Sequence, residues 1–387
     1  MTVWMAGAQH APTQRLAGEE PALAGGILGI DLKALAANWQ RIAAQHPQAE
    51  CGAVVKADAY GLGMEQVAPA LARAGCNSFF VALPAEAERL RALLPSARIF
   101  VFSGLPAGEA AFFHEHSVVP VLNDMAEVEE WAAYCRRREL RLPAALHVDT
   151  GMNRLGLPPA DARRLAQRRE LLECFRPQLL MSHLACADTP GHEMNTRQHA
   201  LFEEIAALFD GVPTSLANSA AALAWPQWRQ DVLRPGIALY GGNPFSDRPN
   251  PMQPVVSLYA TVLQVREVKK GETVGYGASW RARADSRIAI LGVGYADGIC
   301  RCLSSSAEGT AQVFIAGQFA PYAGRVSMDL LAVDVSHIPA DSLERGMRAE
   351  ILGSHISVDE MARWASTIPY EILTSLGQRF TRLYTPA

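Results

Sequence analysis

The chain has 387 residues, of which 49% are hydrophobic and 19% are charged, and its formal net charge is −4. At roughly 100–200 residues per domain, this length predicts two globular domains, and the small negative charge does not favour nucleic acid or an anionic membrane as a partner. No apolar run reaches the ~18 residues of a transmembrane helix, so none is predicted.

Seven cysteines are scattered along the chain without a CxxC pair. This pattern favours free thiols in a reducing cytoplasm over a disulfide framework or a zinc site, and no metal site is predicted. Residues 1–25 contain Gln, Thr, Arg and Glu and end at a Gly-Gly pair, and their apolar start is short for a signal peptide. We expect this segment to be a disordered extension and the protein to remain in the cytoplasm.

A short strand at 27–31 and an amphipathic helix at 32–44 open the organised part of the chain. Apolar runs of strand length then alternate with helical patterns. The predicted strands are 51–56, 78–83, 98–102, 118–122, 144–149, 179–184, 214–218 and 231–234. Eight strands alternating with helices predict a parallel (β/α)8 barrel over residues 26–245, with a doubly wound open sheet as the alternative.

The pattern changes at residues 243–251, a segment rich in Pro, Asn and Ser that predicts a loop or linker. After it, β-type runs dominate, and only two short helices are expected, at 358–365 and 370–376. Residues 246–387 are therefore predicted to form a mainly β C-terminal domain, which makes the whole chain an α/β protein.

The segment 53–63, with the sequence AVVKADAYGLG, contains the lysine about which the chemistry is predicted to be organised. Lys56 follows a β-branched run and precedes Gly61 and Gly63, which places it at or near the end of a strand, before a turn. Such a lysine is either an ordinary solvated charge or an amine that forms a Schiff base with a carbonyl cofactor.

This segment resembles the pyridoxal-phosphate lysine motif of alanine racemases, the bacterial enzymes that interconvert L- and D-alanine. Other segments resemble the same family in the same order, namely DTGMNRLG at 149–156, RPGIALYG at 234–241, TVGYGASW at 273–280 and GRVSMD at 324–329. The resemblance implies a barrel followed by a β domain, with the first strand, here 27–31, able to associate with the β domain. It also implies pyridoxal 5′-phosphate as cofactor, alanine as substrate and D-alanine for peptidoglycan as the product.

The resemblance further implies a cofactor site at the carboxyl ends of the barrel strands, where barrel enzymes place their working residues. Arg154 would face the phenolic oxygen of the cofactor and the substrate carboxylate, both suited to a guanidinium. Arg234 would face the pyridine nitrogen and leave it unprotonated, which suits proton removal and return at Cα. The other implied cofactor-binding residues are Lys56, Tyr60, His183, Asn218, Ser219, Gly236, Ile237 and Tyr370.

Two of these residues have a simpler interpretation, since Asn218 and Ser219 alone indicate a helix N-cap. A helix N-terminus is also where phosphate binds, and barrels often carry a phosphate site after strands seven and eight. We therefore expect the phosphate between this segment and Gly236.

Racemisation needs a base on each face of the substrate, and the resemblance implies Lys56 on the D face and Tyr276 on the L face. In the family this tyrosine reaches the barrel of the other subunit, so a head-to-tail homodimer with shared active sites is expected. The substrate would be bound by Arg154, Met328 and Tyr276. An access corridor would include Asp188, Tyr295, Arg301 and Arg325.

One position departs from the family pattern. Many alanine racemases have a lysine directly before Val-Asp-Thr-Gly-Met, and its carbamate orients the arginine; here the residue is His147, which cannot form that carbamate. We hypothesise that another group orients Arg154, for example a bound chloride. The alternative functions are a broad-specificity or serine racemase, a decarboxylase on the same barrel, and a non-catalytic pyridoxal-phosphate carrier that resembles the barrel alone.

Overall fold

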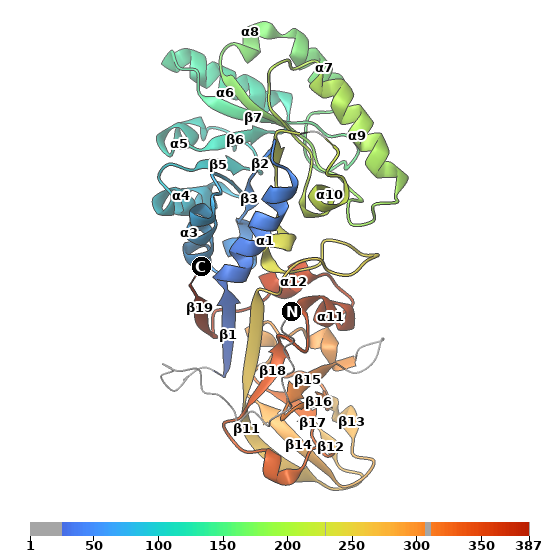
Figure 1. The fold of residues 1–387 in the computed structure, drawn as a ribbon. Coiled ribbons are helices and arrows are strands. Elements are labelled where there is room, and N and C mark those ends of the chain that lie inside the picture. Colours follow the sequence, from blue (N-terminus) through green and yellow to red (C-terminus); the bar gives the residue numbers. More distant parts are fainter. Residues whose placement is uncertain (1–24, 229, 306–310, 387) are drawn as a thin grey trace, which may run out of the picture. The chain divides into compact units, whose positions relative to one another are not determined.

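A computed structural model describes residues 25–228, 230–305 and 311–386. The expected disordered extension lies, except for Gly25, outside the described residues. The chain divides into two compact units (Figure 1). Of the described residues, the barrel unit contains those of Ile30–Val256, Pro369–Thr374 and 384–386, and the β unit contains those of 25–29, Ser257–Ile368 and Ser375–Leu383.

Parallel strands form the inner layer of the barrel unit, and seven of them pair in the sequential order β3 to β9. An eighth position is filled by β10, which is parallel to β2. The bounds are β2 Glu50–Cys51, β3 Ala53–Val54, β4 Ser78–Val81, β5 Arg98–Val101, β6 Val119–Leu122, β7 Pro143–His147, β8 Arg176–Met181, β9 Thr214–Ser215 and β10 Val232–Leu233.

Backbone hydrogen bonds close this ladder into a barrel. Arg234 N donates to Ala217 O at 3.0 Å, which links the ends of β9 and β10, and Val54 N donates to Pro235 O at 2.9 Å, which links β3 to the end of β10. Because only one residue separates β2 from β3, the two short strands run as one. The closed arrangement confirms the predicted (β/α)8 barrel and excludes the open sheet.

Helices follow most of the barrel strands and lie outside them (Figure 1). Asp31 caps the first helix by accepting from Lys33 N and Ala34 N, both at 2.9 Å, as expected for an N-cap carboxylate. The bounds are α1 Leu32–Gln45, α3 Met64–Ala74, α4 Pro84–Leu93, α5 Ala110–Glu115, α6 Met125–Arg138, α7 Pro159–Gln167, α8 Arg169–Leu172, α9 Glu193–Ala206, α10 Ser219–Ala224 and α12 Pro369–Thr374.

An eight-stranded sheet dominates the β unit, with the order β16-β15-β18-β11-β1-β19 and with β14 and β17 continuing from β11. The long strand β11 pairs with β18 from Leu258 to Thr261 and with β14 from Val262 onward, with an irregularity in the β14 register between Val262 and Gln264. A β-bulge at such a point lets one strand serve two neighbours. The bounds are β1 Gly26–Asp31, β11 Val256–Val268, β12 Thr273–Val274, β13 Trp280–Arg281, β14 Ser286–Leu291, β15 Gln312–Ile315, β16 Gln318–Pro321, β17 Leu331–Asp334, β18 Arg348–Leu352, β19 Thr381–Thr385 and α11 Val358–Trp364.

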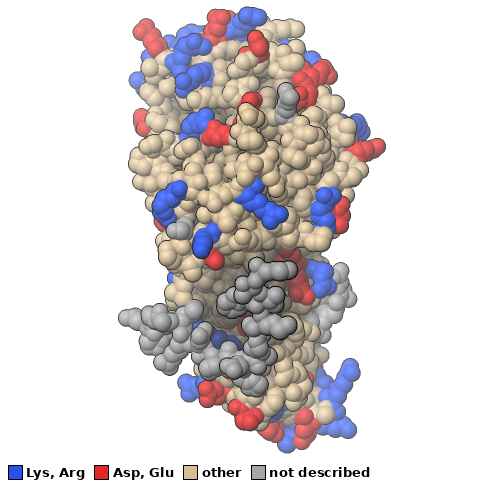
Figure 2. Space-filling view, in the orientation of Figure 1, with Lys and Arg blue, Asp and Glu red and all other residues tan. Residues whose placement is uncertain are grey.

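Basic and acidic side chains are interspersed on the face drawn in Figure 2, in keeping with 35 Lys and Arg against 39 Asp and Glu in the sequence. Within the described ranges, the helices are all too short or too polar to cross a membrane. All seven cysteines lie in these ranges, and each is a free thiol.

Candidate active site

Lys56 stands two residues after the end of β3 and opens a turn with an unusual backbone. The four residues that follow it, Ala57 to Tyr60, have φ values of 51° to 57°. This left-handed conformation costs an L-residue about 1–2 kcal/mol, so contacts elsewhere in the fold must hold the turn. The sequence predicted a turn at Gly61 and Gly63; the structure shows that it begins at Ala57.

The left-handed turn ends on Tyr60, whose ring packs between two other aromatic rings. It stacks on Tyr240 with the centroids 4.4 Å apart, and the ring of Tyr370 lies 6.0 Å away. The hydroxyl of Tyr240 in turn donates to Val54 O at 2.8 Å, at the end of β3. Burial raises the pKa of Tyr60, so its hydroxyl is protonated and can donate a hydrogen bond.

The Tyr60 hydroxyl lies against Gly236, just after β10. A Cβ atom on Gly236 would lie 2.2 Å from this hydroxyl oxygen, so only glycine permits the approach. Ser219 Oγ joins the same group by accepting from Gly236 N at 2.8 Å and from Ala238 N at 3.3 Å. The structure thus brings together Tyr60, Ser219, Gly236 and the adjacent Ile237 as a set of small or hydroxyl-bearing residues after β9 and β10.

Asn218 acts on its own helix. Its Oδ1 accepts from Ala221 N at 3.0 Å and caps α10, which is the simpler of the two interpretations of this residue.

Arg234 is a buried cation, with 2% of its surface exposed. Its guanidinium donates to Ser215 Oγ and, at 2.6 Å, to Ser182 O. Both acceptors are neutral, so these contacts hold the side chain in place without neutralising its charge. Burial lowers the pKa of Arg234 to about 9, so the guanidinium remains charged near neutral pH.

His147 ends β7 and His183 follows β8, where the charges of Arg234 and Arg154 act on both rings; Arg154 itself is exposed in the loop after β7. Burial, followed by Arg234 and then Arg154, lowers the pKa of His183 to about 3. Burial is also the main reason that the pKa of His147 falls to about 4. Burial and the Arg154 guanidinium likewise lower the pKa of Lys56. Both histidines are therefore neutral at physiological pH, and the Lys56 amine loses its proton more readily than an ordinary lysine does, which favours the form that acts as a nucleophile or a base.

Asp149 organises the loop that carries Arg154. Its carboxylate accepts from the backbone N–H groups of Gly151, Met152 and Asn153 at 2.8–3.1 Å. The sequence could have indicated this role, because an Asp after a strand and shortly before a Gly is typical of such Asx turns.

Gln198 on α9 is a second positioning residue, and the sequence did not predict it. It is fully buried, and its Nε2 donates to His183 O at 2.9 Å and to Thr150 Oγ1 at 3.3 Å. Its Oε1 accepts from Ala185 N at 2.8 Å. One amide therefore joins the loop after β7 to the loop after β8.

The β unit brings together a separate group of predicted site residues. Tyr276 lies in the loop of the β12–β13 hairpin and is 69% exposed, and Met328 is 52% exposed. Gly294 allows the segment carrying Tyr295 to touch the segment carrying Met328, because a Cβ there would lie 2.3 Å from Ser327 O. The guanidinium of Arg325 lies beside Gly277, in the hairpin loop.

Two further residues hold these segments. Ser304 Oγ donates to Arg301 O at 2.6 Å and accepts from Val326 N at 2.8 Å, which joins Arg301 to the segment of Arg325. Arg379, which was not predicted, donates to both carboxylate oxygens of Asp297 at 2.7 and 2.9 Å and to Asp329 Oδ1 at 2.7 Å.

Asp188, the remaining predicted residue, lies in the barrel unit. Its backbone carbonyl accepts from Ser246 N at 3.0 Å, and its charge adds to the effect of burial in raising the pKa of Tyr370 to about 12.

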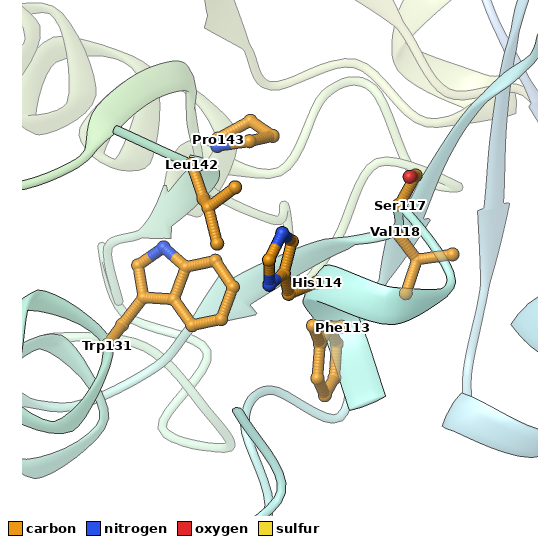
Figure 3. A pocket seen from close by; sticks show the side chains of 7 residues that line it. All are labelled: Phe113, His114, Ser117, Val118, Trp131, Leu142 and Pro143. Carbon is orange, nitrogen blue, oxygen red and sulfur yellow. The ribbon is translucent and has the colours of Figure 1, made fainter. Parts of the chain in front are cut away.

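A pocket of about 110 Å³ lies away from all of these residues (Figure 3). It is adjacent to the amino-terminal ends of β6 and β7, whereas barrel enzymes work at the carboxyl ends. The residues that line it are Phe113, His114, Ser117, Val118, Trp131, Leu142 and Pro143.

Comparison with known proteins identifies the family. The alanine racemase N-terminal domain matches residues 30–244, and the alanine racemase C-terminal domain matches residues 255–384. The chain belongs to the alanine racemase family. This confirms the resemblance drawn from the lysine motif.

Relatives and solved structures of the family match nearly the whole chain. The alanine racemase of Methylobacterium sp. (strain 4-46) is 51% identical over 93% of this chain and 98% of its own length. The biosynthetic alanine racemase of Agrobacterium fabrum is 45% identical over 93% and 94%. A crystal structure of Bartonella henselae alanine racemase with covalently bound pyridoxal phosphate has a TM-score of 0.89 at 37% identity, and covers 94% of this chain and 100% of that one.

Proposed function

We propose that the chain is a pyridoxal-phosphate-dependent alanine racemase, an isomerase that interconverts L- and D-alanine and supplies D-alanine for peptidoglycan. The observation that carries the proposal is Arg234. A guanidinium that is 2% exposed and held by two neutral acceptors suits a neutral acceptor such as an unprotonated ring nitrogen. A decarboxylase of this architecture would instead be expected to have a carboxylate there.

The residues present fit the cofactor. Tyr60, Ser219, Gly236 and Ile237 offer hydroxyls and backbone amides to a phosphate, and the glycine at 236 lets the Tyr60 hydroxyl lie against this backbone where a Cβ would otherwise stand. Lys56, with its lowered pKa, offers an amine that can bond to the aldehyde. The bound cofactor would supply electron withdrawal from Cα, which acidifies the Cα proton.

Two side chains would move the proton. Lys56 Nζ takes or returns it on the D face, and Tyr276 Oη does so on the L face. Arg154 and the backbone N–H of Met328 bind the substrate carboxylate, and Asp188, Tyr295, Arg301 and Arg325 line the access corridor.

The active form in this proposal is a head-to-tail homodimer in which Tyr276 and Met328 of one copy serve the barrel of the other. The support is the exposure of these two side chains, 69% and 52%, which leaves them accessible to a second copy of the chain. Free thiols at all seven cysteines suit a reducing cytoplasm, where we place the enzyme.

A panel of L-amino acids tests the function. Purified protein with pyridoxal phosphate is incubated with L-alanine, L-serine and larger L-amino acids, and the D-enantiomers are separated and measured. We expect alanine to give the largest kcat/KM. Racemisation of another amino acid without alanine would overturn the specificity, and cofactor binding without any racemisation would favour the carrier alternative.

A further inference from the structure

The backbone directly after Lys56 is held by a neighbouring helix. The left-handed turn begins at Ala57, so the peptide between Lys56 and Ala57 sets the direction in which the lysine side chain leaves the chain. A turn of four consecutive left-handed residues without glycine does not form unaided.

Glu86, in the first turn of α4, supplies the contact. Its Oε1 accepts from Ala57 N at 2.6 Å, while its Oε2 accepts from Ala82 N at 2.8 Å and from Leu83 N at 3.1 Å. One carboxylate thus ties the peptide after Lys56 to the end of β4. Hydrogen bonds to an ionised acceptor are shorter and stronger than neutral ones, and the 2.6 Å contact is the shortest of the three.

Arg89, one turn further along α4, holds the next residue of the turn. Its guanidinium donates to Asp58 Oδ1 at 3.2 Å and to Glu65 Oε1 at 2.6 Å. Asp58 Oδ1 also accepts from Met64 N at 3.1 Å. Helix α4 therefore contacts the turn at two places, through the Glu86 carboxylate at Ala57 and the Arg89 guanidinium at Asp58.

We propose that Glu86 is a positioning residue that aims the Lys56 amine by fixing the Lys56–Ala57 peptide. The proposal rests on the proposed function, in which Lys56 bonds the cofactor and carries the proton. Glu86 touches neither the cofactor nor the substrate in this proposal and acts only through the backbone.

A charge effect accompanies the positioning. Glu86 raises the pKa of Lys56, against the lowering by burial and by Arg154, and His183, which also faces the amine, is neutral. Removing the carboxylate should therefore lower the pH at which the amine becomes reactive, while the loss of the backbone contact makes the reaction slower.

The test uses Glu86→Gln, with Glu88→Gln as the matched control. Glu88 lies on the same helix, its side chain is 61% exposed and it faces His116 at 3.6 Å. In Glu86→Gln an amide NH2 must face either Ala57 N–H or the Ala82 and Leu83 N–H groups, so one of these contacts is lost. Cofactor-free enzyme is mixed with pyridoxal phosphate, the rate of covalent attachment is followed by absorbance, and borohydride reduction with peptide mapping identifies the lysine.

We expect Glu86→Gln to slow covalent attachment roughly 10- to 100-fold, the scale of a misplaced reacting group, and to shift its pH profile downward. Its affinity for 4-deoxypyridoxine 5′-phosphate, which has no aldehyde, should match that of the wild type. Equal attachment rates in Glu86→Gln and Glu88→Gln would overturn the inference, and so would an equal loss of affinity for both cofactor forms.

One outcome distinguishes a failure of the proposed function from a failure of this inference. Attachment of the cofactor to a lysine other than Lys56 in the wild-type protein would refute the proposed function itself. If Glu86→Gln does not fold, Glu86→Asp carries the same comparison, because it keeps the charge but shortens the reach.

Discussion

Replacing Gly236 by alanine tests the phosphate site at a single atom. The new Cβ would lie 2.2 Å from the Tyr60 hydroxyl oxygen and 3.0 Å from its Cζ, so the ring must move by about 1 Å to restore ordinary contact distances. Tyr60 cannot move freely, because Tyr240 stacks on it at 4.4 Å and Tyr370 lies at 6.0 Å. The expected result is that its hydroxyl no longer reaches the phosphate.

The expected loss of cofactor binding free energy is that of one hydrogen bond to a charged group, about 1.5–3 kcal/mol. At 1.4 kcal/mol per tenfold change in Kd, Gly236→Ala should weaken pyridoxal phosphate binding by about 10- to 150-fold. The Kd is measured by titrating cofactor-free enzyme and following protein fluorescence or visible absorbance.

Three variants isolate the cause. Gly191→Ala is the matched control, since a Cβ there meets nothing within 4 Å, and it should leave the Kd unchanged. Tyr60→Phe removes the hydroxyl alone and should cause a similar loss. In the double variant the two losses should not add, because both remove the same contact. Wild-type affinity in Gly236→Ala, or additive losses in the double variant, would refute the reasoning.

Three other changes have direct readouts. Lys56→Ala should abolish the visible absorbance of the lysine-bound cofactor, while the control Lys33→Ala, at an exposed position of α1, should keep it; a persistent band in Lys56→Ala would mean that another lysine binds the cofactor. Tyr276→Phe should slow exchange of the L-alanine Cα proton in D2O by about 10²- to 10⁴-fold with unchanged cofactor affinity; a parallel loss of both would indicate a structural role. His147→Gln should make the free energy of unfolding depend less on pH below 6.5. The pKa of His147 is about 4 in the folded protein and 6.5 ordinarily. The unfolded chain therefore binds a proton first, and the free energy of unfolding of the wild type falls by about 3 kcal/mol between pH values above 6.5 and pH 4. Urea unfolding at pH 7.5 and 4.5 measures this, and equal losses in both proteins would contradict it.

The barrel was predictable because its strands are buried on both faces and form apolar runs of strand length. The runs 51–56 and 144–149 predicted β2–β3 and β7 to within two residues at each end. The residues after such strands could also be assigned to one end of the barrel, because all parallel strands end there. For this reason the sequence predicts Lys56, Arg154 and Arg234 at the same end of the barrel.

The turn after Lys56 could not be predicted from local propensity. Ala57, Ala59 and Tyr60 disfavour left-handed φ, and the contacts that accompany it come from distant segments, such as Glu86 accepting from Ala57 N and Arg89 donating to Asp58. Contacts of this kind depend on tertiary structure and cannot be predicted from the local sequence of either segment.

The same limit explains Gln198 and Arg379. A glutamine in an amphipathic helix and an arginine near the chain end are each ordinary surface residues by sequence. The structure gives them roles because the loops after β7 and β8 approach α9, and because the segments of Asp297 and Asp329 approach Arg379.

His147 shows how the structure narrows a question that the sequence could only raise. Asn123 Nδ2 donates to Val121 O at 2.8 Å and to Phe102 O at 3.3 Å, so its Oδ1 faces His147 Nδ1 at 2.8 Å as an acceptor. The proton of the ring must then reside on Nδ1, which leaves Nε2 as an acceptor. With a pKa of about 4 the ring is neutral at physiological pH. His147 therefore brings no positive charge that would hold an anion, and a chloride beside Arg154 would depend on the guanidinium groups alone. What His147 does offer in place of a carbamate is the lone pair on Nε2, an acceptor suited to a guanidinium and switched off only when the pH falls far enough to protonate the ring.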